Sequence, residues 1–156
     1  MPFFDITWEE SNLREYLNNE FFYSFSYEER QRILLSHVCN PSNEWFSTRG
    51  GNNTTDYIFL LSISEVVRYF GDSGLLDNPN PPVYGMRQWL LSDEYNPARI
   101  ANDINGEAVI WWLRSPGFDL DFTATVYRDG SINLDGRAAN LDNIGIRPAL
   151  LISLIP

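Results

Sequence analysis

The chain has 156 residues, enough for one domain with a substantial core, and 15% of them are aromatic. Its formal charge is −10, and it contains no lysine and no basic run. These properties exclude a disordered chain, lysine-based nucleophilic chemistry, and binding to nucleic acids or anionic membranes through their phosphates.

Cysteine and histidine are scarce. Cys39 is the single cysteine, which excludes an internal disulfide and a zinc site built from cysteines. His37 is the single histidine, so a Ser–His–Asp triad or a histidine-based metal site would rest on one residue. No segment approaches the roughly 20 apolar residues of a membrane span, and the N-terminus lacks the basic start and apolar run of a signal peptide. We therefore expect no membrane insertion, and whether the parent polypeptide is exported or displayed at a cell surface stays open.

Short helices are predicted in the first third of the chain. Thr7 and Glu10 are spaced as in a capping box, and the apolar residues that follow recur at helical spacing. Ser26 and Glu29 repeat the capping signal before a second helix, which we expect to reach Ser36.

The middle of the chain alternates between loops and short elements. Residues 47–55 are small and polar and predict a loop, and the apolar residues 57–61 predict a strand. Ser62 and Glu65 predict the start of a third helix. Residues 71–84 are expected to be irregular. The sequence of residues 89–105 indicates no single type of element, and the interpretation is one helical turn within a long loop.

The last third is rich in β-strand signals. Residues 108–114 predict a strand that stops at Ser115-Pro116-Gly117. Asp129-Gly130 lies between two β-prone runs, which predicts a hairpin with a type I′ turn, and Asp135-Gly136 predicts a second turn. Residues 145–154 form a last apolar run that we expect in the same sheet, with Pro148 favouring an edge position. Helices first and antiparallel strands last indicate an α+β protein.

Several motifs occur along the chain in a recognisable order. The strongest are Trp111-Trp112-Leu113-Arg114-Ser115-Pro116-Gly117 and Gly145-Ile146-Arg147-Pro148-Ala149-Leu150, with Gly130 in a hairpin between them. Upstream lie Thr7-Trp8-Glu9-Glu10-Ser11-Asn12-Leu13-Arg14, Phe25-Ser26 and Thr54-Thr55-Asp56. In this order the motifs resemble the DUF6273 family of bacterial proteins, which occurs largely in gut Firmicutes, and the resemblance covers nearly the whole chain.

The resemblance implies a single domain over residues 1–156 with a C-type-lectin-like fold, similar to formylglycine-generating enzymes and to variable proteins of diversity-generating retroelements. Such a domain has N-terminal helices, then a small twisted antiparallel sheet with long irregular loops. Family members usually carry one or more strands before the Thr-Trp-Glu segment, whereas this chain begins almost at Thr7. Three explanations stay open: the domain lacks those strands, residues 3–6 replace them, or the last strand pairs elsewhere, including with a second copy in a homodimer.

The tryptophan pair and the turns after it are the candidate ligand site. Alternation along a strand sends Trp111 and Trp112 to opposite faces, so we expect one in the core and one near the surface, with burial of both as the alternative. Mixed aromatic and short polar residues in turns resemble an antibody paratope, although turns favour Asn and Asp in any case. The candidate ligand-binding residues are Trp111, Phe118, Asp119, Asp121, Phe122, Arg137, Asn140, Asp142 and Asn143.

Other residues are expected to hold this site rather than to contact the ligand. Each of the two arginines, Arg114 and Arg147, can tie several acceptors together, so we interpret them as clamps. The structural frame then comprises Trp112, Arg114, Gly145 and Arg147. The expected core is Trp8, Leu13, Leu17, Phe59, Leu61, Trp112 and Leu150.

The function that these features favour is a non-catalytic module that binds a glycan or protein through a variable loop face, without a cofactor or metal. The main alternative is a structural or assembly domain of a larger surface or phage-related protein. An enzyme of the formylglycine-generating type is disfavoured because Cys39 lies far from the C-terminal half. Calcium binding through Asp119, Asp121, Asp129, Asp135 and Asp142 is also disfavoured, because the usual lectin triplets are missing.

Overall fold

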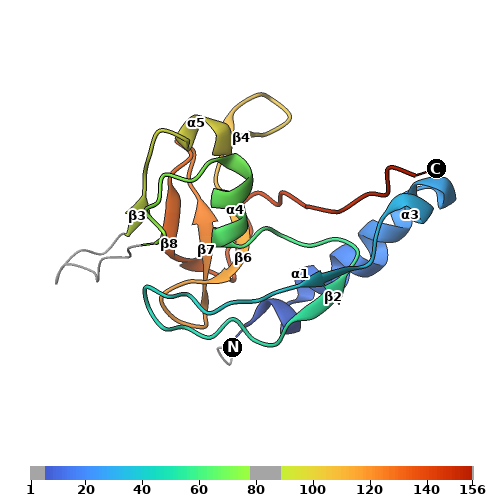
Figure 1. Ribbon diagram of the computed structural model, residues 1–156, viewed down its shortest axis with the longest axis horizontal. Helices are drawn as coiled ribbons and strands as arrows, with labels where there is room; N and C mark the ends of the chain where they lie inside the picture. The colour runs from blue at the N-terminus through green and yellow to red at the C-terminus, as the bar shows by residue number, and fades with distance from the viewer. Residues whose placement is uncertain (1–5, 78–88, 156) are drawn as a thin grey trace.

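The computed structural model describes residues 6–77 and 89–155 and shows an α+β architecture (Figure 1). Its main sheet has four antiparallel strands in the order β3 (Leu90–Leu91), β8 (Ile132–Ala138), β7 (Phe122–Val126) and β6 (Trp111–Pro116). Two two-stranded pairs accompany it: β1 (Ser36–Val38) with β2 (Thr54–Asp56), and β4 (Ala101–Asn102) with β5 (Ala108–Val109). None of the helices in these two ranges is long and apolar enough to cross a membrane.

The N-terminal helical region differs from its prediction at its first turn. Thr7 precedes a 3-10 turn, η1 (Trp8–Glu10), and its side chain makes no capping bond to the backbone. The helix starts instead at Ser11, whose hydroxyl accepts from the Arg14 backbone N–H. It then runs through α1 (Asn12–Tyr16), a π-helical turn η2 (Leu17–Phe21) and α2 (Phe22–Ser24).

The second predicted helix is present but shorter than expected. Ser26 and Glu29 form a complete capping box at the start of α3 (Tyr27–Arg32). The helix ends at Arg32 because the next residues pair with the C-terminal segment, where Leu34 N–H donates to the Leu151 carbonyl (2.8 Å). The expected extension to Ser36 was therefore wrong, and Ser36 begins β1.

In the middle of the chain, Ser62 and Glu65 form the predicted capping box of α4 (Ile63–Phe70). Residues 57–61 are buried or half-buried but form no named strand; Phe59 makes only an isolated antiparallel bridge to Ala149. The predicted helical turn in residues 89–105 is α5 (Asn96–Arg99). Residues 78–84 of the region predicted to be irregular lie outside the described part of the chain.

The predicted hairpin between β7 and β8 is present, with a different turn. Tyr127 N–H donates to the Ser131 carbonyl (2.8 Å), which closes a three-residue loop, and only Gly130 in it has a positive φ (84°). Asp129 keeps a negative φ because its carboxylate accepts from both the N–H and the hydroxyl of Ser131. The loop is thus a type I turn followed by a left-handed glycine, not a type I′ turn.

Two further strand boundaries were predicted wrongly. β6 continues through Ser115 and Pro116, and Asp135 and Gly136 lie inside β8 rather than in a turn. Gly136 has a φ of 80°, and the pairing of β7 with β8 shifts register between Thr123 and Thr125. The glycine therefore accommodates an irregularity within a continuous strand.

The C-terminal segment does not add a strand to the main sheet, contrary to the prediction. Gly145 makes a parallel bridge to Trp111, accepting from Trp112 N–H (3.0 Å) and donating to the Ile110 carbonyl (2.7 Å). Beyond Pro148, which has no N–H to donate, the chain leaves the sheet and runs along α3 (Figure 1). There it bridges to Phe59 and then to Ile33.

The expected core is largely confirmed. Trp8, Leu17, Phe59, Leu61 and Trp112 are buried, and Leu13 and Leu150 are partly buried against the same cluster. Buried residues of α4 and the sheet complete the core, among them Val66, Leu113, Val126 and Ile132.

Asp56 ties the N-terminal motif to β2. Its carboxylate accepts from the Trp8 indole N–H (2.9 Å), the Arg14 Nε (2.7 Å) and the Thr54 hydroxyl (2.6 Å). The Trp, Arg and Asp of the upstream motifs are thus structural, and they hold η1 and α1 against the β1–β2 pair.

Arg114 joins the sheet to the rest of the molecule. Its side chain is buried, and all five of its N–H groups have acceptors: Asn40 Oδ1, the carbonyls of Cys39 and Leu60, and both carboxylate oxygens of Glu65. One guanidinium therefore fastens β6 to α4 and to the segments after β1 and β2. No lysine could reach these acceptors with the same planar arrangement.

Replacing Arg114 by methionine should lower the free energy of unfolding by about 3–5 kcal/mol, because Glu65 and three other acceptors would lose their buried partner. Urea denaturation measures the change. Arg128→Met is the matched control: Arg128 is exposed in the hairpin turn, so its loss should stay within about 0.5 kcal/mol. Equal effects of the two substitutions would contradict the clamp.

Glu65 should make the stability depend on pH. Burial raises its pKa, but the hydrogen bonds and charge of Arg114 outweigh burial, so the pKa lies below its ordinary value of 4.5. A lowered pKa stabilises the fold above about pH 4.5, and this stabilisation is lost as the pH falls through the folded-state pKa. The stability difference between wild type and Glu65→Gln should therefore be largest above pH 4.5 and shrink below it in urea titrations. A difference independent of pH would contradict this assignment.

Candidate functional site

Five aromatic rings from three distant segments meet beside one end of the main sheet, and we call this group the aromatic face: Trp45, Phe46, Trp89, Phe118 and Phe122. Trp89 lies edge-on to Trp45 (centroids 6.2 Å apart) and to Phe46 (5.8 Å). Phe118 contacts Phe46 (6.3 Å) and Phe122 (4.3 Å). Phe118 is 46% exposed and the other four rings are half-buried, so the cluster reaches solvent.

Two residues in the middle of β8, Leu134 and Asp135, hold all three segments. Leu134 N–H donates to the Trp89 carbonyl (2.9 Å), and Asp135 Oδ1 accepts from Trp89 N–H (3.0 Å). The Asp135 carbonyl accepts from Phe118 N–H (2.9 Å), and the Leu134 carbonyl accepts from Asn43 Nδ2 (2.8 Å). Backbone groups and one carboxylate of a single strand therefore position the segments that carry the rings.

Asn43 fixes the loop that bears Trp45 and Phe46. It is buried; its amide also donates to the Pro116 carbonyl (2.9 Å), and its Oδ1 accepts from Trp45 N–H (3.1 Å).

The loop from Gly117 to Phe122 is equally constrained, because Gly117 N–H donates to the Phe122 carbonyl (2.7 Å). A Cβ at Gly117 would lie 2.3 Å from the Asp135 carbonyl oxygen, so this close approach requires glycine.

The candidate ligand residues in the turn after β6 lie on this face or beside it. Phe118 and Phe122 belong to it, and the intervening Asp119 is exposed and Asp121 half-buried. Arg137 lies opposite Thr123 in β8, with its guanidinium 5.3 Å from the centre of the Tyr127 ring.

The later candidates extend away from the aromatic face. Ala139 N–H donates to the Asp121 carbonyl (2.9 Å), which joins the end of the loop after β6 to the start of the loop after β8. Beyond this point Asn140, Asp142 and Asn143 are exposed, on a segment that leads to Gly145 beside Trp111. The structure thus brings residues 118–122 together with Trp45, Phe46 and Trp89, and separates part of the predicted loop set from them.

The polar side chains of these two loops contrast with those that hold the fold. Within residues 6–77 and 89–155, the side chains of Asp121, Arg137, Asn140, Asp142 and Asn143 make no hydrogen bond or ion pair, and Asp119 accepts only from Leu120 N–H. Arg114, by comparison, uses all its donors. The loop side chains therefore remain available to a partner.

Trp111 does not belong to the exposed face, contrary to the prediction. It is 1% exposed, and its indole N–H donates to the Arg99 carbonyl (3.0 Å). Since Trp112 is also buried, the alternative that both indoles lie inside is the one observed.

Arg147 lies over the Trp111 ring and donates to the same Arg99 carbonyl (3.4 Å). Its guanidinium lies 4.9 Å from the Trp111 ring centre and 4.7 Å from that of Phe70. Burial lowers the pKa of Arg147. Like Arg114, it contacts interior groups of the protein.

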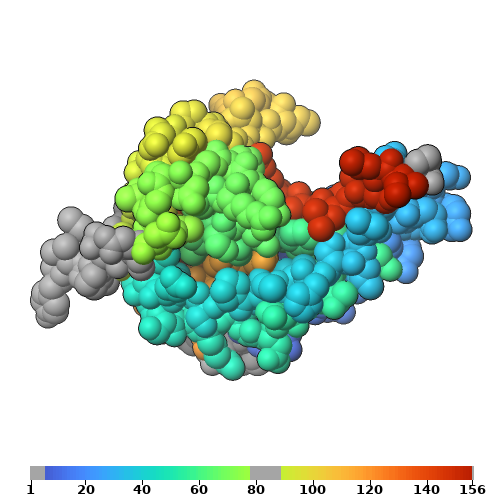
Figure 2. Space-filling view, viewed as in Figure 1, coloured from blue at the N-terminus to red at the C-terminus, as the bar shows by residue number. Residues whose placement is uncertain are grey.

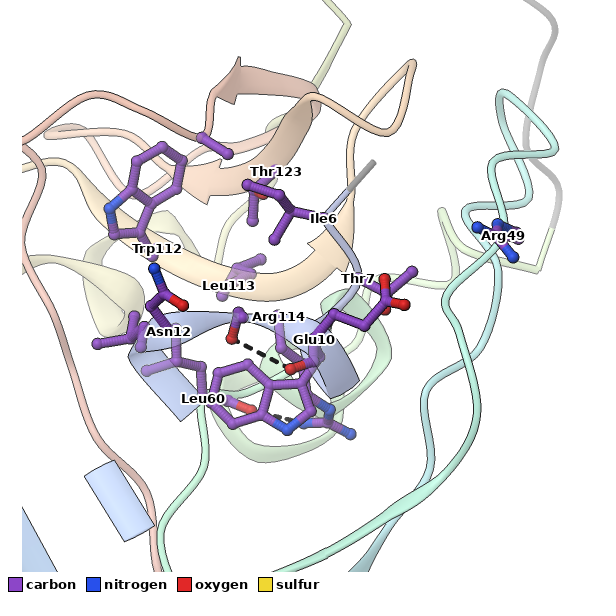
Figure 3. Close-up of a pocket in the computed structure, with 14 residues that line it drawn as sticks. Ile6, Thr7, Glu10, Asn12, Arg49, Leu60, Trp112, Leu113, Arg114 and Thr123 are labelled. Atoms are coloured by element: carbon purple, nitrogen blue, oxygen red, sulfur yellow. Dashed lines mark hydrogen bonds between the residues drawn. The ribbon is translucent and has the colours of Figure 1, made fainter. Parts of the chain in front are cut away.

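A cavity of about 770 Å³ lies between the N-terminal segment and the sheet (Figure 3). Trp112, Leu113 and Thr123 form the sheet side, and Ile6 to Leu13 form the other, with Glu10 and Asn12 at its polar part. Ala139 also lines it. Because Thr123 and Ala139 follow Phe122 and Ala138 directly, the cavity begins next to the loops that carry the candidate residues.

No group of three or more His, Cys, Asp or Glu residues suited to a metal ion occurs in the described parts of the chain. Two of the five aspartates considered for calcium have structural roles. Hydrogen bonds from Ser131 lower the pKa of Asp129, and Asp135 binds Trp89 N–H. His37 and Cys39 are both exposed, at and just beyond the end of β1.

Sequence reasoning missed Trp45, Phe46 and Trp89 as partners of Phe118, and it missed Arg99. Arg99 is fully buried, pairs with Asp93 (2.9 Å) and donates to the Gly71 carbonyl (3.1 Å). The pairing keeps the pKa of Asp93 below its ordinary value although burial raises it. An Asn-x-Trp-Phe segment in a polar region was the available signal for the aromatic face.

These features define a small α+β domain in which buried, hydrogen-bonded polar side chains support exposed loops. The family model described as a domain of unknown function, DUF6273, matches residues 2–154, so the chain belongs to this family. No curated protein and no solved structure matches the chain.

The division between frame and loops predicts opposite effects on stability. Single alanine substitutions of Phe118, Asp121, Arg137, Asn140 or Asn143 should change the free energy of unfolding by no more than about 0.5 kcal/mol each. Trp111→Ala should cost about 3–5 kcal/mol, because it leaves a cavity and removes the indole hydrogen bond to the Arg99 carbonyl. Thermal and urea melts decide between these outcomes, and a loop substitution as costly as Trp111→Ala would overturn the division.

Proposed function

We propose that this domain is a non-catalytic module that binds a glycan or a protein surface through the aromatic face and the adjoining loop residues Asp119 and Asp121. The observation that carries the proposal is the contrast between backbone and side chains in these loops. The segments that carry the rings are held by hydrogen bonds to Leu134 and Asp135 of β8. The Asp121 carboxylate, in contrast, has no hydrogen-bond partner among the described residues, and that of Asp119 accepts only from the neighbouring Leu120 N–H.

Such an arrangement lowers the cost of binding. A loop that is already ordered loses little conformational entropy when a ligand arrives, and half-exposed rings offer a large rigid contact area. Aromatic side chains also dominate the energetics of many protein interfaces. The exposed carboxylates would add orientation through hydrogen bonds.

The finer fold that we propose is C-type-lectin-like, with the tryptophan-rich strand β6 and the Gly145-Ile146-Arg147 segment as the two parts that frame the loops. The bridge between Trp111 and Gly145 supports this reading. In that setting, residues 118–143 are candidates for diversification by a retroelement in a gut bacterium, because their exchange would leave the buried frame intact.

An assembly role in a larger surface or phage-related protein is the second candidate. It is favoured by the apolar side chains exposed on the projecting region formed by α3 and the C-terminal segment. The two roles use different surfaces and can be tested separately.

Phe118→Ala should weaken binding at least about tenfold, because an exposed ring at the centre of a contact commonly contributes 1.4 kcal/mol or more. The measurement is a glycan array and a surface-protein library probed with wild type, followed by titration of any hit. Tyr69→Ala is the matched control, since Tyr69 is an exposed ring on α4 outside the aromatic face.

Loss of binding in Phe118→Ala but not in Tyr69→Ala supports the proposal, and whether the hit is a sugar or a protein identifies the ligand class. A wild-type ligand that binds both variants equally would show that the aromatic face is not the site. A hit that the protein chemically converts would overturn the non-catalytic part.

A further inference from the structure

The C-terminal segment has one paired edge and one unpaired edge. On the inner edge, Ala149 exchanges two hydrogen bonds with Phe59 (2.7 and 3.0 Å), the Leu151 carbonyl accepts from Leu34 N–H (2.8 Å), and Ser153 N–H donates to the Arg32 carbonyl (2.7 Å). Peptide groups alternate in direction along a strand, so those of Leu150, Ile152 and Leu154 face the other edge. They make no hydrogen bond to any described residue.

The side chains around this edge are apolar and exposed. Leu154 and Ile155 are 85% and 80% exposed, and Leu151, Ile152, Leu34 and Leu35 are each about half exposed. No charged residue occurs from Pro148 to the end of the sequence, in a chain whose net charge is −10. Figures 1 and 2 show this segment lying along α3 on a projection from the body of the molecule.

From these observations we infer that the edge pairs with the same edge of a second copy of the chain, antiparallel about a two-fold axis near Ile152. In this arrangement Leu150 of each copy lies close to the 152–154 region of the other, and the free peptide groups form about four to six hydrogen bonds between the chains. The result is a continuous small sheet that crosses the axis and ends at the α3 regions of both copies.

Self-pairing is favoured over another partner by charge and by area. The segment is uncharged, so two copies meet here without opposing the like charges that cover the rest of an acidic molecule. The six exposed leucine and isoleucine side chains present an apolar surface area of roughly 600 Å² per copy. An interface of standard size buries about 800 Å² per partner, which is of the same order. A long, apolar, unpaired edge is also the surface that soluble proteins rarely leave uncovered.

Sedimentation velocity over roughly 1–200 µM protein, a range that spans ordinary dimer affinities, tests the inference. We expect wild type to reach twice its monomer mass of 18.0 kDa, and Ile152→Lys to remain monomeric, because a charge at the axis meets its own copy. Ile104→Lys is the matched control: Ile104 is fully exposed in the turn between β4 and β5, so this variant should dimerise like wild type. Circular dichroism melts establish that both variants are folded.

Cysteine cross-linking tests the pairing geometry directly and does not depend on the lysine variant. In a Cys39→Ser background, Ile152→Cys should form an intermolecular disulfide on mild oxidation, since residues near the axis of an antiparallel pair lie close enough for that bond. Ile104→Cys in the same background should cross-link at least tenfold less.

A monomeric wild type over the whole range, dimers that persist in folded Ile152→Lys, or equal cross-linking at positions 104 and 152 would each overturn the inference. Association with a different strand-forming protein at this edge, with wild type itself monomeric, would also overturn it. These outcomes are independent of the ligand screen, because the aromatic face and the C-terminal edge share no residue.

Discussion

The fold depends on one buried guanidinium. Arg114 lies on β6, yet its acceptors come from α4, from the segment after β1 and from the run that follows β2. The named strands are short, and residues 57–61 form no strand at all. Side-chain hydrogen bonds therefore hold segments together that backbone hydrogen bonds would join in a larger sheet. Asp56, Arg99 and Asn43 act in the same way at three other junctions.

This construction separates the residues that maintain the structure from those that meet solvent. Most polar groups of the interior are paired with one another, with Arg99 Nε and the Thr125 hydroxyl as exceptions among the described residues. The loops after β6 and β8 are anchored through their backbones. Side chains such as those of Asp121 and Asn140 can therefore change without removing an interaction on which the frame relies. A family built this way can keep its motifs fixed while its surface varies.

Sequence reasoning succeeded where the relevant chemistry is local. Ser26 with Glu29, Ser62 with Glu65, and the Asp129-Gly130 hairpin all involve groups within a few residues of one another. The type of the hairpin turn was missed because the Ser131 hydrogen bonds to Asp129 compete with the left-handed conformation that a type I′ turn requires. The end of α3 and the path of residues 145–154 were missed because the two segments pair with each other, although they lie more than a hundred residues apart in the chain. Trp89 contacts Trp45 and Phe46, and Phe46 in turn contacts Phe118. These rings come from three segments far apart in the chain, so local patterns do not place them together.

The hydrogen bonds of Asn43 also bear on how the protein forms. They span 73 and 91 residues, and those of Arg114 span 49 to 75. Closing such long loops is entropically costly before the contacts stabilise the chain, so folding rates fall as contacts become more distant in sequence. The first half of the chain cannot complete its own interior until β6 and β8 have been synthesised. During translation, Leu60, Val66 and the rings near Asn43 are synthesised several seconds before the strands that cover them, at about 5–20 residues per second. Their apolar surface is therefore exposed on the nascent chain for that time.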